Sequence, residues 1–89
     1  MEITEIRIFA VDERRVKAYS SVVFDECFIV RDLKVIQGDS KLFVAMPSKK
    51  MKDGTYRDTV HPLNNEMRYK IETSVLAAYE KELNKSKTQ

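Results

Sequence analysis

Hydrophobic residues in the first half of the chain follow the two-residue period of β-strands. In the segment 16–24, VKAYSSVVF, alternate side chains are predicted to share one face. These side chains are Val16, Ala18, Ser20, Val22 and Phe24. Further predicted strands, separated by polar turns, are residues 2–11, 27–36, 41–46 and 55–60. This part of the sequence therefore predicts about five short antiparallel strands.

The third predicted strand, CFIVRDLKVI, changes phase along its length. Phe28 and Val30 share one parity, whereas Leu33 and Val35 share the other. One extra residue on one strand of an antiparallel pair produces such a shift. The sequence therefore predicts a β-bulge at Arg31–Asp32.

After Pro62 the hydrophobic period changes to that of a helix. The apolar stripe recurs every fourth residue and consists of Met67, Ile71, Val75, Tyr79 and Leu83. Either Asn64 or Asn65 can cap the start of this helix. We expect the helix to run for roughly 18–20 residues, within the usual range. We expect residues 84–89 to form a disordered tail.

Together these elements predict an α+β fold: a small antiparallel β-sheet of about five strands followed by one C-terminal amphipathic helix. The chain has 89 residues, enough for a single domain, which we place at residues 1–83. One helix can cover only one face of the sheet, yet the strands at 27–36 and 41–46 are apolar on both parities. We therefore expect a symmetric dimer.

The composition is that of a globular protein of a reducing compartment. Hydrophobic residues make up 43% of the chain and charged residues 34%, which does not fit a disordered protein. The single cysteine, Cys27, excludes an intramolecular disulfide and a cysteine-rich metal motif. No apolar run approaches the ~18 residues that a membrane span requires, and the first residues are too acidic for a signal peptide. We expect a cytoplasmic protein without a cofactor, a metal or a membrane partner.

The positive charge of the chain is concentrated in one segment. Residues 1–48 carry seven Lys and Arg against eight Asp and Glu, whereas residues 49–57 carry a net charge of +3. Pro47 ends the preceding strand, and Asp53–Gly54 predicts a tight hairpin turn. Cations at the tip of a hairpin suit the phosphates of nucleic acid, because each neutralised phosphate releases counterions. The candidate nucleic-acid-binding residues are Lys49, Lys50, Lys52, Arg57 and Arg68.

Other interpretations of this hairpin remain open. A lysine-rich hairpin can simply keep a sheet edge soluble. It can also recruit an acidic protein, which would make the chain a protein-interaction module. Nearby cations would extend the basic surface if the fold brings them alongside: Arg7, Arg14, Arg15, Lys17 and Lys70. RNA is an alternative to DNA as the ligand, because a basic hairpin does not distinguish the two.

An enzyme is the weakest interpretation. It would pair His61, the only histidine, with Asp58 and with Ser48, Thr59 or Cys27 as the nucleophile. No nucleophile elbow or glycine-rich loop accompanies these residues. We expect His61 to satisfy backbone groups at the corner before the helix. We expect Cys27 to be an inert, buried thiol beside Phe28. The sequence thus predicts no catalysis and no small-molecule substrate.

The segments LFVAMPSKK, DGTYRD and HPLNNEMR, in this order, resemble the SpoVG family, also called stage V sporulation protein G or septation regulator. The match also includes MEITEIRI and VFDECFIVRDLKVIQG and extends to about residue 80. The resemblance implies a small, homodimeric, cytoplasmic bacterial protein that binds specific nucleic-acid sites. It also implies a role in regulating gene expression, sporulation and cell division.

The resemblance assigns roles to particular residues. It implies that Lys49 and Lys50 contact DNA, that Arg57 and Arg68 assist them, and that the helix influences sequence preference. In this chain Lys50 stands where arginine is common in the family. Lysine is a point charge without the two-pronged geometry of arginine. We therefore expect phosphate binding to be retained, and we carry over no target sequence from the family.

Overall fold

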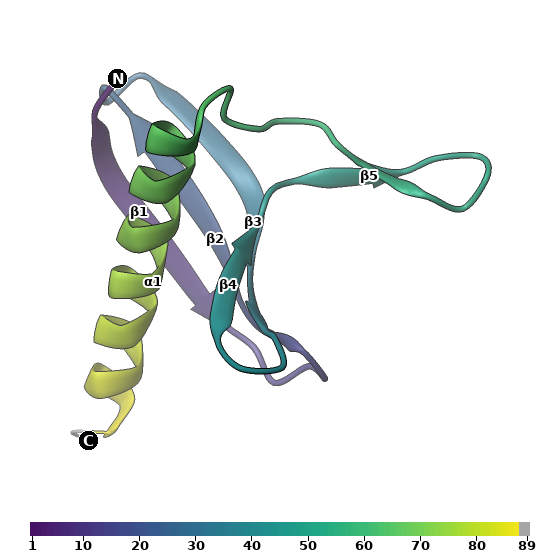
Figure 1. Ribbon diagram of the computed structural model, residues 1–89. Coiled ribbons are helices and arrows are strands. Elements are labelled where there is room, and N and C mark those ends of the chain that lie inside the picture. The colour runs from purple at the N-terminus through teal and green to yellow at the C-terminus, as the bar shows by residue number, and fades with distance from the viewer. Residues whose placement is uncertain (88–89) are drawn as a thin grey trace.

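The computed structural model describes residues 1–87 as two antiparallel sheets and one helix (Figure 1). The strands are β1 (Ile3–Ala10), β2 (Val16–Phe24), β3 (Phe28–Gln37), β4 (Leu42–Ala45), β5 (Ser48–Lys50) and β6 (Tyr56–Asp58), and the helix is α1 (Asn65–Lys87). Strands β1 to β4 form the main sheet in the order β1-β2-β3-β4, and β5 pairs only with β6. The α+β class and the single C-terminal helix are confirmed.

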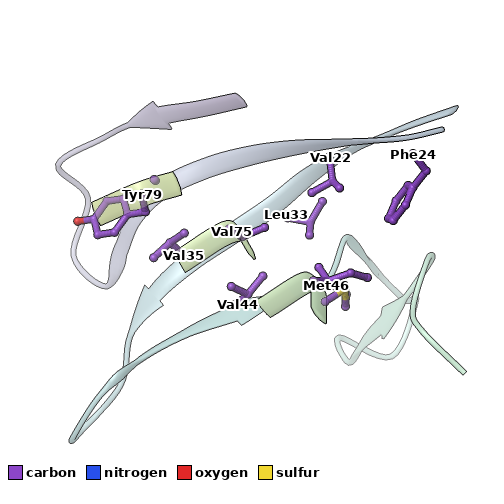
Figure 2. Packing of buried hydrophobic residues seen from close by; sticks show 10 residues of the cluster. Val22, Phe24, Leu33, Val35, Val44, Met46, Val75 and Tyr79 are labelled. Atoms are coloured by element: carbon purple, nitrogen blue, oxygen red, sulfur yellow. The ribbon is translucent and has the colours of Figure 1, made fainter. Parts of the chain in front are cut away.

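The core lies between α1 and one face of the main sheet. The inward side chains of β2 are buried in the predicted alternation, from Ala18 to Phe24. Val75 of α1 is completely buried and lies among Leu33, Val35 and Val44 of the sheet (Figure 2). The helix is therefore held by the apolar stripe that its sequence predicts.

The predicted bulge in β3 is confirmed. Ser20 pairs with Leu33 and Val22 pairs with Val30, so one residue of β2 faces two residues of β3. Asp32, inside this bulge, has a φ of 68°. Val30 and Leu33 lie three positions apart and would point to opposite faces of a regular strand. Because of the extra residue, both side chains pack against the core under the helix.

The predicted five-stranded arrangement is wrong for the segment 55–60. Its strand, β6, does not join the main sheet but pairs with β5, which the sequence analysis did not assign as a strand. Pro47 ends β4 and has no amide hydrogen for a ladder. After Pro47, β5 leads into a turn in which the Met51 amide donates to the Thr55 carbonyl at 2.7 Å. The turn places β6 directly beside β5, and these two strands pair with each other.

The helix begins as predicted but ends later than predicted. Asn64 caps it, with its Oδ1 accepting a hydrogen bond from the Met67 amide at 2.8 Å. The helix continues to Lys87, past the expected end near residue 83. Residues 84–87 contain neither glycine nor proline, so nothing in the sequence stops the helix. Residues 88–89 of the expected tail lie outside the described residues.

The face of the main sheet opposite the helix carries partly exposed apolar side chains. Phe9 of β1 is 60% exposed and Phe43 of β4 is 38% exposed. Phe9 pairs with Tyr19, and Ile36 pairs with Phe43, so these side chains follow one face. No helix among residues 1–87 has both the length and the apolar character needed to cross a membrane.

Candidate nucleic-acid interface

A basic hairpin, here called the arm, consists of residues 48–58 and projects from one end of the main sheet (Figure 1). No Cα of β5 or β6 lies within 8 Å of the main-sheet strands or of α1, apart from positions adjacent in sequence. Every residue of the arm is exposed. The arm therefore contributes little to the core, and its side chains are accessible to solvent.

The register of the arm distributes its charges over both faces. Lys49 pairs with Arg57, and Lys50 pairs with Tyr56. Directly opposed residues of an antiparallel pair share a face, with Cβ atoms roughly 5 Å apart. One face thus carries two cations, and the other carries a cation beside an aromatic ring. Lys52 lies in the turn between the two strands.

The tip of the arm is shaped by Asp53 and Gly54. The Asp53 carboxylate accepts hydrogen bonds from the Thr55 hydroxyl at 2.7 Å and from the Thr55 amide at 3.0 Å. These two hydrogen bonds, the hydroxyl first, lower the pKa of Asp53. Gly54 has a φ of 91°, a conformation that side chains disfavour. The acidic residue of the tip, Asp53, thus stabilises the turn through its hydrogen bonds with Thr55.

A shallow hollow lies at the base of the arm, where the chain returns toward α1. It is lined by Tyr56, Arg57, Asp58, His61 and Arg68. Arg68 is in the first turn of α1, and its amide donates to the Asn64 carbonyl at 3.2 Å. The structure therefore brings the predicted residues Arg57 and Arg68 to one place, although eleven positions separate them in the sequence.

His61 contacts the backbone, as predicted, and also lines this hollow. Its Nδ1 lies 3.1 Å from the carbonyl oxygen of Pro62. The sequence pattern alone does not place His61 beside the arginines. The signal that could have done so is its position between the returning strand of the arm and the helix that carries Arg68.

On its other side, His61 borders an apolar cavity of about 100 Å³ under the start of α1. Its wall includes Phe24 and Phe28 from the main sheet and Met67 from the helix. The linker between the arm and α1, residues 59–64, therefore lies against the end of the core. This contact between the linker and the core determines where the hollow lies relative to the sheet.

The other cations considered in the sequence do not join the arm. Arg15 forms an ion pair of 3.1 Å with Asp39, and Arg7 pairs with Glu5. The β1–β2 loop lies at the opposite end of the main sheet from the arm (Figure 1). Lys70 donates to the Met1 carbonyl at 3.2 Å. Within the described chain, the basic surface consists of the arm and Arg68.

The expectation of a buried Cys27 is wrong, since this side chain is exposed. It follows a tight turn in which Asp25 and Glu26 have φ values of 51° and 57°. The turn reverses the chain between β2 and β3 and lifts Cys27 off the sheet. Asp58 and His61 both line the hollow, but Cys27 does not. Cys27 is thus not gathered with Asp58 and His61, whereas Ser48, another candidate nucleophile, is the cross-strand partner of Asp58.

Comparison with known proteins agrees with the motifs. The SpoVG family model matches residues 1–81. A relative from Bdellovibrio bacteriovorus is 63% identical over 93% of this chain and 77% of its own length. One from Anaeromyxobacter sp. (strain Fw109-5) is 55% identical over 96% of this chain and 88% of its own length. One from Clostridium acetobutylicum is 47% identical over 100% of this chain and 95% of its own length. All three are named "Putative septation protein SpoVG". The chain therefore belongs to the SpoVG family.

Proposed function

We propose that this protein is a homodimeric, non-enzymatic regulator that binds specific sites in DNA, with RNA as an alternative ligand, and acts in bacterial gene expression and septation. The observation that carries the proposal is the arm: a projecting hairpin with four cations, all exposed and none needed by the core. The septation role is proposed from the name of the relatives. A cytoplasmic location is part of the same proposal.

The arm suits the nucleic-acid backbone for two reasons. Its cations lie on both faces, so a hairpin entering a groove can meet phosphates on either side. Its tip carboxylate is held in the turn by Thr55, which keeps that negative charge in a fixed place. Phosphate contacts position such a protein, while contacts to bases specify the site.

Arg68 extends the basic surface from the arm to the start of α1. Because both arginines border the hollow, a backbone that reaches the base of the arm would meet the helix there. The exposed residues at the start of α1 are then the proposed source of sequence preference. Tyr56, exposed beside Lys50, offers a stacking surface for an unpaired base.

The proposal of a homodimer is supported by the uncovered face of the main sheet. Phe9, Phe43 and Ile29 are all more than one-third exposed there. A second copy would bury these side chains, and it would supply a second arm for a neighbouring stretch of backbone. Sedimentation equilibrium at micromolar concentration tests this part, and a monomer mass would contradict it.

The decisive experiment measures the salt dependence of binding to duplex DNA and to single-stranded RNA. We expect a steep loss of affinity with salt, and we expect Lys49→Ala plus Lys50→Ala to flatten the slope by about 0.9 per lost duplex contact. An unchanged melting temperature controls for folding. If the double variant keeps the wild-type slope, the arm is not the phosphate-binding element. If the wild type binds no nucleic acid at low salt but captures an acidic protein, the chain is an interaction module.

A further inference from the structure

We infer that His61, together with Arg57 and Arg68, forms a phosphate subsite at the base of the arm, and that protonation of His61 makes nucleic-acid binding depend on pH. The inference rests on the proposed function and adds a proton-linked contact to it. It concerns a residue to which the sequence analysis gave only a structural role.

The three residues of this subsite come from three parts of the chain. Arg57 belongs to β6, His61 to the linker and Arg68 to the first turn of α1, yet all three line one hollow. All are exposed. A phosphate oxygen accepts hydrogen bonds and carries negative charge, so it matches two guanidinium groups and a protonated imidazole.

The hydrogen bond to Pro62 determines what His61 can offer. A carbonyl oxygen accepts only, so Nδ1 carries a hydrogen in the neutral ring. The remaining nitrogen, Nε2, is then an acceptor and cannot bind a phosphate oxygen. When the ring gains a proton, Nε2 becomes a charged donor. The same contact to Pro62 persists in both states, so the ring need not reorient.

The charged and titratable groups around His61 are few. Besides His61, the residues that line the hollow are Arg57, Asp58 and Tyr56 from β6 and Arg68 from α1. On the cavity side the lining is apolar and includes Met1 together with side chains of the strands. A bound phosphate favours the imidazolium, because its negative charge offsets the cations around the hollow. Binding should therefore be accompanied by proton uptake at His61.

The test measures affinity for duplex DNA at fixed salt between about pH 6 and about pH 8, the interval over which histidine ordinarily loses its proton. We expect wild-type affinity to fall about fivefold across this interval, and the salt slope to lose about 0.9, the equivalent of one phosphate contact. In His61→Gln, which keeps a neutral side chain, both changes should disappear. In His61→Lys, affinity should stay at the wild-type level of low pH throughout.

The variants share every other titrating group, including the amino group of Met1, so a change that disappears in His61→Gln belongs to His61. A wild type that binds with the same pH dependence as His61→Gln would overturn the inference and leave the proposed function standing. A wild type that binds no nucleic acid at any pH would overturn both. A fall in the melting temperature of His61→Gln is separated from binding by measuring affinity well below the transition.

Discussion

One face of the arm provides a quantitative test of how its charges act. Lys49 and Arg57 are cross-strand partners, so their Cβ atoms are roughly 5 Å apart and their long side chains can reach adjacent phosphates. A slope of about 0.9 per phosphate means that one lost contact weakens duplex binding about fivefold near 0.15 M salt. If the contacts are independent, Lys49→Ala plus Arg57→Ala should weaken binding about thirtyfold and flatten the slope by about 1.8.

The assay is fluorescence anisotropy of a labelled duplex over a salt series, with both single variants and the double variant. The matched control is Lys41→Ala plus Lys81→Ala, which removes the same charge from exposed positions outside the arm. We expect the control to keep the wild-type slope. If the control flattens the slope as much as the arm variant does, net charge and not the arm controls binding, and the reasoning fails. A double variant only about fivefold weaker than wild type would mean that both side chains share one phosphate.

Two further predictions concern the fold and the tip of the arm. Ser20→Ala should stabilise the protein by about 1 kcal/mol, because the buried Ser20 hydroxyl has no hydrogen-bond partner among residues 1–87; a lower melting temperature in thermal unfolding would contradict this. The Thr55 amide signal in NMR should titrate with Asp53 at a midpoint below the ordinary aspartate value of about 3.9, since hydrogen bonds from Thr55 lower the pKa of Asp53. The ionised carboxylate stabilises the turn above that ordinary value, and this contribution is lost as the pH falls through the lowered pKa; a midpoint at or above the ordinary value would refute it.

Features of the main sheet and the helix start could be predicted from the sequence because local patterns determine them. The alternation of residues 16–24 gave the buried face of β2, and the phase change in β3 gave its bulge. The cap at Asn64 follows from its own side chain. In each case one strand or one turn of helix contains the whole signal.

The pairing of the arm's strands could not be predicted in the same way. The pattern of residues 55–60 is that of a strand, and nothing in it says with which strand it pairs. The pairing depends on residues outside this segment. Pro47 ends the pairing of the main sheet after β4, and the turn between Met51 and Thr55 joins β5 to β6. The exposure of Cys27 was missed for a related reason. Its apolar neighbours suggested burial, but the left-handed turn at Asp25–Glu26 displaces it from the sheet.

The separation of the arm from the core also bears on how such a protein can evolve. Most substitutions in a packed interior cost stability, so folding filters them before function does. Substitutions in the arm should cost little stability, because neither of its strands packs against the main sheet or the helix. Charge, spacing and aromatic content at the tip can therefore drift without compensating changes in the core. Descendants of one scaffold could thus acquire different targets while keeping the same fold.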